Sequence, residues 1–203
     1  MAEALIKLPP PDLKGEKSVE EVIAARRSVR RYKAEALTLS QLSKILWAGQ
    51  GITAAGNYRT IPSAGATFPL EVYTLAGEQT VADLKAGIYQ YETHVHSLRP
   101  HLDGDLRQEL AEAALNQRFI ATCPADIVVC AIFNRTTNRY GKRGEMYVHM
   151  ETGHLGQNIA LQAVALGLGT VMIGAFDDYE VSKVLRIKEP LKPLYIIPVG
   201  KPA

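Results

Sequence analysis

The segment that most limits how this chain can fold is the run ADIVVCAIF at residues 125–133. Its one charged residue is Asp126 and nearly all the rest is apolar, so it is too hydrophobic for a strand with one face in water. Strands that are buried on both faces have this near-continuous apolar composition. The run therefore predicts a strand in the centre of a sheet.

Helical and strand patterns mix around this run without a regular strand–helix–strand repeat. Two capping boxes, Ser18 with Glu21 and Thr38 with Gln41, predict helix starts, and the first helix should end near Arg26. We therefore predict an α+β fold with a central mixed or antiparallel sheet flanked by helices. The other expected elements are strands at 70–75, 86–92, 94–100, 170–174 and 194–200, a long helix at 145–167, and shorter helices at 104–118 and 179–187 that Asp103 and Asp178 would cap.

Length and composition fit one domain of ordinary globular character. The chain has 203 residues, of which 47% are hydrophobic and 22% charged, so it can bury a sizeable core. We expect one domain over 1–203, with an extended tail over 1–17. No apolar run reaches the roughly 18 residues of a membrane span, and the N-terminus lacks the pattern of a signal peptide. We expect a cytoplasmic protein without membrane contact, in which both cysteines are reduced.

A local cluster of positive charge is the first functional signal. Arg26, Arg27, Arg30 and Arg31 lie within six residues around Ser28, whereas the whole chain, with 23 Lys+Arg and 21 Asp+Glu, carries a net charge of only +2. Arginine presents paired donors that match phosphate oxygens, so the cluster predicts an anion site. Two alternatives remain: a solvated helix end, where arginine offsets the macrodipole, and a non-enzymatic binder of nucleic acid.

Several familiar catalytic signals are absent from the sequence. The glycines of GLGTVMIG follow a helix and precede a strand, which is the reverse of a dinucleotide-binding turn. There is no GxxxxGK[ST] or HExxH motif, and His94, His96 and His101 lack a nearby cysteine or paired carboxylates. We therefore predict neither a hydrolase nor a metal site. What remains is a set of loops, PSAG, IGAF and the region of Lys201, that could hold a planar anionic cofactor beside the arginine cluster.

These segments together resemble the nitroreductase family, and most closely its SagB-type dehydrogenase branch. The motifs that carry the resemblance are RRSVR, PSAG, GHLGQN, GLGT, GAFDD and VGKP, in family order over roughly residues 8–202. The segment GATFPLE, which begins at the glycine of PSAG, departs from the pattern of classical nitroreductases and favours the SagB-type branch. The resemblance implies an FMN-dependent enzyme that forms a homodimer, with long helices in the dimer core and each flavin between the subunits.

The resemblance also assigns the phosphate side of the cofactor. It implies that Arg26, Arg27 and Ser28 bind the FMN phosphate and ribityl chain, helped by Lys201. Arg30 should lie near the pyrimidine edge of the flavin, where positive charge favours the reduced ring.

The ring side is assigned in the same way. Pro62, Ser63, Ala64 and Gly65 should come from the partner subunit and line the ring, and Gln117 should place its amide against it. Gly174 and Ala175 should present backbone amides near N5, the atom that accepts hydride. Because the cofactor carries the chemistry, we name no catalytic side chain.

The expected activity is hydride transfer from NADH or NADPH through flavin N5 to an electron-poor acceptor, such as a quinone, nitroaromatic or flavin. An alternative is a SagB-type dehydrogenase that oxidises a peptide azoline or another reduced heterocycle. Some SagB-type relatives use a Lys–Tyr pair as base, and Lys142, Tyr140 and Tyr147 are available for this role. The alternative from another class is the anion or nucleic-acid binder, against which the near-neutral net charge argues.

Overall fold

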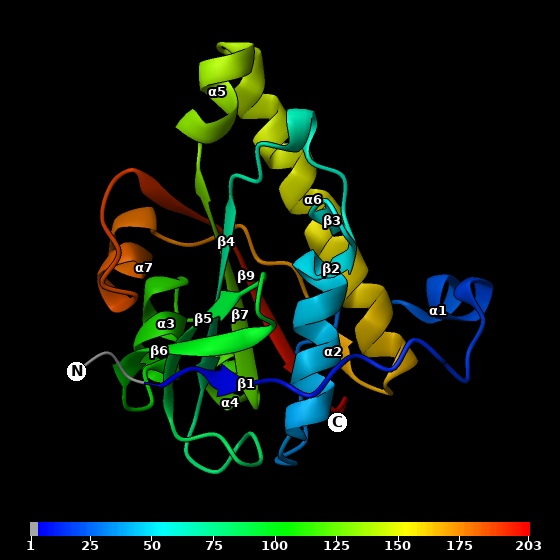
Figure 1. Cartoon of the computed structure of the whole chain (residues 1–203). Helices are drawn as coiled ribbons and strands as arrows, with labels where there is room; N and C mark the ends of the chain where they lie inside the picture. Colours follow the sequence, from blue (N-terminus) through cyan, green and yellow to red (C-terminus); the bar gives the residue numbers. More distant parts are fainter. Residues whose placement is uncertain (1–3) are drawn as a thin grey trace.

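The computed structural model, which describes residues 4–203, has a seven-stranded sheet as its centre (Figure 1). Every neighbouring pair in the sheet is antiparallel. The run 125–132 forms β7, which lies between β4 and β9 with residues 125–131 buried, so the predicted central strand is confirmed. The strand order is β1 (Ile6–Lys7), β6 (Ser97–Asp103), β5 (Gly87–Glu92), β4 (Leu70–Ala76), β7 (Ala125–Ile132), β9 (Leu191–Gly200) and β8 (Gly169–Thr170).

Helices cover both faces of this sheet, which is why β7 is apolar on both sides. Ile127 and Val129 belong to the core under α2 (Leu39–Gln50) and α6 (Arg143–Ala165), whereas Val128 and Cys130 belong to the opposite core. That second core is closed by α3 (Arg107–Ala113), α4 (Phe119–Thr122) and α7 (Asp178–Val184). The α+β fold with an antiparallel sheet flanked by helices is therefore confirmed.

The remaining elements lie along α6 or at its ends. Helix α1 (Val19–Ala25) and the segment before it project from the body beside the end of α6, and α5 (Asn134–Tyr140) stands at the start of α6 (Figure 1). A small hairpin, β2 (Ile52–Ala54) with β3 (Tyr58–Arg59), and the 3-10 turn η1 (Ala64–Ala66) run along α6 toward α5.

Both predicted capping boxes are present, but other helix boundaries were wrong. The side chains of Ser18 and Thr38 each accept from the backbone amide of the third helical residue, and their own amides donate to the side chain of that residue. Asp103 is not a cap, because it is the last residue of β6 and the helix begins only at Arg107. Asp177 caps α7 in place of Asp178, since only Asp177 has the extended backbone that lets its side chain reach the Glu180 amide at 2.9 Å.

The expected strand at 170–174 is shorter in the structure. Only Gly169 and Thr170 form β8, and Ile173 then makes an isolated bridge to Ile196. The long helix is close to its predicted bounds, whereas α4 and α5 were not predicted at all. Both cysteines are buried and free, in agreement with the expected reduced core residues.

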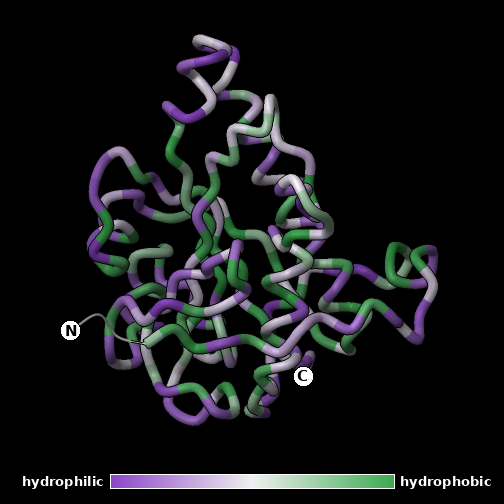
Figure 2. The backbone as a smooth tube through the Cα atoms, in the orientation of Figure 1, coloured by the Kyte–Doolittle hydropathy of each residue, from purple (hydrophilic) through white to green (hydrophobic). Residues whose placement is uncertain are grey.

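The N-terminal segment is only in part the expected extended tail. Its first three residues lie outside the described part of the chain. Ile6 and Lys7 pair with β6, and Leu8 is buried in the main core. Pro9 and Asp12 still contact α2, through Ser43 and Lys44. The segment then projects from the body, and Figure 2 shows hydrophobic positions on the projecting part. Leu13, Val19 and Ile23 are 75%, 63% and 55% exposed, so this part carries apolar surface that one copy of the chain leaves uncovered.

Within residues 4–203, no helix combines the length and the apolar character needed to cross a membrane.

Candidate functional site

The arginine cluster leaves the end of α1 and is held at the open edge of the sheet. The Arg26 amide makes the last bond of α1, to Val22 O at 3.0 Å. Beyond it, Ser28 forms a parallel bridge with Thr170 of β8, and the Val29 amide donates to Thr170 O at 2.9 Å. The Tyr32 hydroxyl donates to Val29 O at 2.6 Å and closes the loop on itself. Ser28 therefore has a fixed position beside β8.

The end of the last strand holds the other side of the same segment. The Lys33 amide donates to Lys201 O at 2.9 Å, and the Ala203 amide donates to Arg31 O at 3.1 Å. The backbone of Lys201 is thus brought beside the segment that carries the arginine cluster. Lys201 Nζ lies 2.8 Å from Glu35 Oε2, and this contact holds the pKa of Glu35 below its usual value.

The arginine side chains themselves have two different environments. The Arg27 guanidinium folds back and donates to Ala24 O and Arg26 O at 3.0 and 2.7 Å, which is the helix-end arrangement that the sequence left open. Arg26 and Arg30 have no carboxylate within ion-pair distance among the described residues. Arg26 and Arg30 therefore lie on either side of Ser28 in the chain as cations without a carboxylate partner.

Gly174 and Ala175 continue the same edge at its other end. Ile173 exchanges two hydrogen bonds with Ile196 of β9, at 2.9 and 3.0 Å, and Gly174 follows at once. Both Gly174 and Ala175 are exposed, and no hydrogen bond to another described residue engages either amide. The Gln117 side chain donates to Ala175 O at 3.0 Å, so the structure brings these three predicted residues together.

The two groups form one elongated site along the edge of β9. Thr170, which pairs with Ser28, and Gly174 are four residues apart in an extended segment, and each residue of such a segment spans about 3.3 Å, for a total of roughly 13 Å. Positive charge lies at the Ser28 end, and free backbone donors lie at the Gly174 end. The arrangement can bind a long ligand with an anionic group at one end and acceptor atoms at the other.

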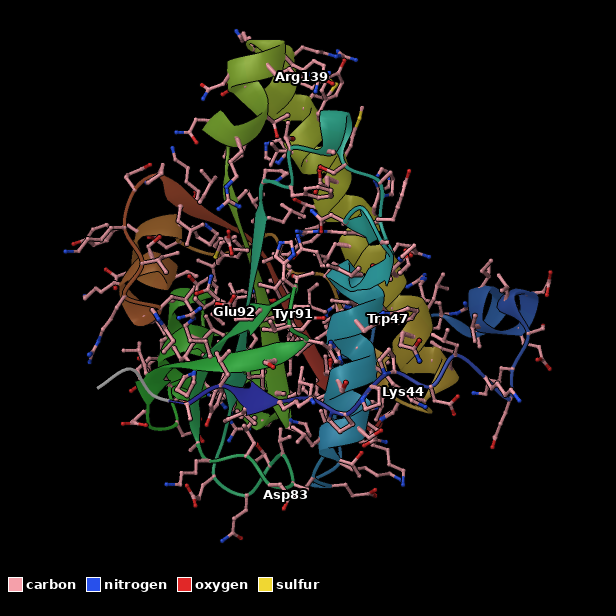
Figure 3. All side chains as sticks on the ribbon, in the orientation of Figure 1. Lys44, Trp47, Asp83, Tyr91, Glu92 and Arg139 are labelled. Atoms are coloured by element: carbon pink, nitrogen blue, oxygen red, sulfur yellow. The ribbon has the colours of Figure 1, made fainter. Side chains whose placement is uncertain are left out.

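The turn over Pro62–Gly65 does not join this site within one chain. It lies at the α5 end of α6, where the Gly65 carbonyl accepts from Arg139 Nη1 at 3.2 Å and Thr67 Oγ1 lies 2.7 Å from Thr136 Oγ1. Figure 3 places Arg139 at that end of the molecule, far from Lys44 and Trp47 on α2. The arginine cluster lies near the other end of α6, which with 23 residues is roughly 34 Å long.

One charged residue near this turn was missed from the sequence. Glu151 is only 3% exposed, and burial raises its pKa to about 7. The signal was present, because Glu151 shares the face of the helix that carries Val148, Leu155 and Ile159, all of them buried. A glutamate on the core face of a predicted helix is an exception that deserves a functional explanation.

His96 and His101 make polar contacts in different parts of the fold. His96 Nε2 lies 2.7 Å from Ser43 Oγ, and Nδ1 lies 2.8 Å from the Tyr91 hydroxyl, so His96 ties β5 and α2 together. His101 Nε2 lies 2.7 Å from Leu185 O on the other face of the sheet. In the part of the chain that the structure describes, no group of three or more His, Cys, Asp or Glu side chains is arranged to hold a metal ion.

The comparison with protein families decides the assignment, because the model of the nitroreductase family matches residues 23–201. This chain belongs to the nitroreductase family. The matched region includes the arginine cluster, the turn at residues 62–65, α6 and the β8–β9 edge, so every element of the site described above lies within it.

Relatives and solved structures agree with this family. A candidate nitroreductase from Methanocaldococcus jannaschii is 47% identical over 191 residues, which cover 94% of each chain. The crystal structure of a candidate nitroreductase from Ralstonia eutropha superposes with a TM-score of 0.85 at 27% identity and covers 99% of this chain and 90% of that one. An NADPH:FMN oxidoreductase from Vibrio harveyi, solved with NAD+, shares the fold with a TM-score of 0.64 at 21% identity, over 91% of this chain and 68% of that one.

Two glycines on the site edge allow a test of how tightly the arginine segment is docked. A Cβ on Gly169 would lie 2.6 and 2.8 Å from Cγ2 and Cβ of Val29, whereas one on Gly174 would lie 3.8 Å from its nearest neighbour, Tyr195. Gly169→Ala should therefore lower the free energy of unfolding by about 1–3 kcal/mol, and Gly174→Ala should change it by less than about 0.5 kcal/mol. Chemical denaturation of the two variants measures both values, and equal stability would contradict the docking of Val29 on β8.

Proposed function

We propose that this nitroreductase-family protein is an FMN-dependent oxidoreductase that uses NADH or NADPH to reduce an electron-poor acceptor. The observation that carries the proposal is the single edge with uncompensated arginines at one end and free backbone amides at the other. FMN has the matching chemistry, with a phosphate at one end and a ring of acceptor atoms at the other. The FMN in the name of the Vibrio harveyi neighbour also supports the choice of cofactor.

The residues on this edge fit such a cofactor. Arg26 and Arg30 lack carboxylate partners, so a phosphate would supply the missing opposite charge without displacing an internal ion pair. The Ser28 hydroxyl is exposed between them and can donate to the same anion. A Cβ placed on Gly174 would lie 3.8 Å from its nearest neighbour, Tyr195. The space beside this backbone is therefore open, and a flat ring can approach the amides closely.

Each residue then has a defined task. Arg26 and Ser28 bind the phosphate, and Arg27 joins them by releasing the α1 carbonyls that it now contacts. Lys201 is within reach as a further cation that Glu35 holds in place. Arg30 supplies positive charge toward the ring, and the amides of Gly174 and Ala175, steadied by Gln117, orient its edge. Bound FMN would supply the redox chemistry itself, by taking a hydride at N5 and passing two electrons to the acceptor.

We also propose that the working unit is a homodimer. Because α6 separates the turn at Pro62–Gly65 from the arginine cluster, the turn can line a flavin only in a second copy of the chain. An exposed stripe follows α6 and includes Met146 and Met150, which are 45% and 48% exposed, then Gly153 and Gln157. A Cβ on Gly153 would meet nothing within 4 Å, so another backbone can approach there.

A second candidate activity is the oxidation of a reduced heterocycle, with a Lys–Tyr pair as base. The Tyr140 hydroxyl lies beside the turn, 2.5 Å from the position of a Cβ on Gly65, and its ring packs edge-on against Tyr147. Lys142 is exposed two residues away. These groups lie at the α5 end of α6, so in the proposed dimer they would stand near the partner's flavin.

The first test is the visible spectrum of the purified protein. We expect flavin absorption bands, with FMN released on heating at a ratio near one per chain, and rapid bleaching when NADH or NADPH is added without oxygen. Flavin that bleaches with neither nucleotide would favour the heterocycle dehydrogenase. A colourless protein that FMN cannot reconstitute would overturn the proposal.

The phosphate site is tested by a double variant. Arg26→Ala with Arg27→Ala removes two charge-assisted contacts worth roughly 1.5–3 kcal/mol each, so FMN affinity should fall by roughly 100-fold or more. Quenching of FMN fluorescence on titration with apo-protein measures this. Arg186→Ala with Lys188→Ala removes the same charge from the α7–β9 connection and should leave affinity nearly unchanged. Equal affinity of both double variants would rule out the arginine site.

The dimer stripe is tested by Gly153→Arg. A charge in the middle of the stripe would be buried without a partner in a dimer, so the variant should sediment as a 22.2 kDa monomer and lose FMN. Tyr179→Arg, at a position on α7 that is 74% exposed, is the matched control and should remain dimeric. A dimer of unchanged mass for Gly153→Arg would move the interface elsewhere.

A further inference from the structure

Glu151 lies on the core face of α6, directly beneath the turn that begins at Pro62. It is 3% exposed, and its Oε1 has no hydrogen-bond partner among the described residues. The Ser63 side chain acts on the Glu151 carboxyl and favours its ionised form. The group is therefore buried between a rigid helix and a surface turn, and one of its two oxygens is not satisfied.

The contacts of Glu151 extend through the whole turn. The Ser63 hydroxyl accepts from the Phe68 amide at 2.9 Å, which closes residues 63–68 into one loop. The Arg59 guanidinium stacks on the Phe68 ring, with Cζ 4.1 Å from the ring centre, and it attracts the Glu151 charge. Glu151, Ser63, Phe68 and Arg59 thus form a ring of contacts around the base of the turn.

Several buried polar atoms near the base of the turn lack a hydrogen-bond partner. Buried atoms without a hydrogen bond include Asn57 Oδ1, Arg59 Nε and Thr60 Oγ1, in addition to Glu151 Oε1. The other charged groups nearby are Glu71 and Arg135, which pair with each other at 2.7 Å and act electrostatically on Arg59. Tyr91 also acts on Arg59. Among the described residues, Arg59 is the cation whose charge acts on Glu151, and burial lowers the pKa of Arg59 despite its acidic neighbours.

We propose that Glu151 is a positioning residue that holds the Pro62–Phe68 turn closed in its protonated form and loosens it in its ionised form. Burial is the main cause that disfavours the charge, and the effect of Ser63 and the attraction of Arg59 offset it only in part. Opening the turn would let water reach the carboxylate. The inference rests on the proposed function in one respect: we take this turn to line the flavin of the partner subunit.

The direction of the pH effect follows from proton linkage. In the closed turn the pKa of Glu151 is about 7, above the usual value for a glutamate in water, so closing the turn takes up a proton that the open turn releases. The closed form is therefore fully favoured at low pH and becomes less favourable as pH rises toward and through 7. Glu151→Gln imitates the protonated side chain and should keep the turn closed at every pH.

Hydrogen exchange of residues 61–68 in the FMN-free protein tests the proposal. At pH 8.5 these amides should exchange at least about tenfold faster in the wild type than in Glu151→Gln, and the difference should vanish near pH 4, where Glu151 is protonated in both forms of the turn. Comparison at the same pH cancels the intrinsic change of exchange rate. Glu145→Gln, an exposed glutamate on the same helix, should match the wild type at both pH values. Equal exchange of the wild type and Glu151→Gln at pH 8.5 would overturn the proposal.

A second variant and a second readout separate this inference from the proposed function. Ser63→Ala removes the link between the turn and α6 and should speed exchange at both pH values. FMN release from the wild type should quicken between pH 5.5 and 8.5 and stay constant in Glu151→Gln. A wild type that binds no FMN would defeat the proposed function, while the exchange experiment still judges Glu151. FMN release that is independent of pH, together with the expected exchange, would disprove the link between turn and flavin.

Discussion

The rest of the site depends on the backbone pairing along the outer edge of β9. Its inner edge is fixed by the ladder with β7, which extends from Ala125 opposite Val199 to Ile132 opposite Leu191. On the outer edge, Thr170 pairs with Val199 and Ile173 bridges to Ile196, so the intervening segment follows the strand. Ser28 then pairs with Thr170 in a parallel β-bridge on the side of β8 that faces away from β9. A shift of β9 would move the arginines and the free amides together.

Helix α6 provides the second constraint, because it sets two ends of the chain apart. Its core face is fixed by α2, where the Asn158 side chain donates to Ala48 O and Thr60 O, both at 3.1 Å. The segments that lie at its two ends in space are the Pro62–Gly65 turn, beside α5, and the arginine cluster, beside α1. Uncompensated arginines and an exposed apolar α1 are costly features for an isolated chain. A bound anion and a second copy would offset both costs, which is why we treat ligand and dimer as one proposal.

Local features of the fold were predictable from the sequence, whereas distant contacts were not. The apolar run around Val128 and the two capping boxes depend only on neighbouring residues, and they were confirmed. Asp177 and Asp178 are equally good caps by residue type, and only the backbone conformation decides between them. The bridge between Ser28 and Thr170 joins segments far apart in sequence, so nothing local could indicate it. The site residues were grouped through a family resemblance, and the structure supplies the physical contacts for part of that group.

Asp126 and Glu151, the two buried carboxylates among residues 4–203, show why position decides what a buried acid can do. Burial raises the pKa of Asp126 well above its usual range, although Arg107 attracts its charge and Cys123 Sγ lies 3.2 Å from its Oδ1. Asp126 stands inside the central strand, between β4 and β9, where only global unfolding brings water to it. Burial therefore favours its protonated form, and no local opening relieves the cost of its charge. Glu151 bears the same cost of burial beneath a surface turn, where a local opening is enough to relieve it, so its proton becomes coupled to the position of that turn.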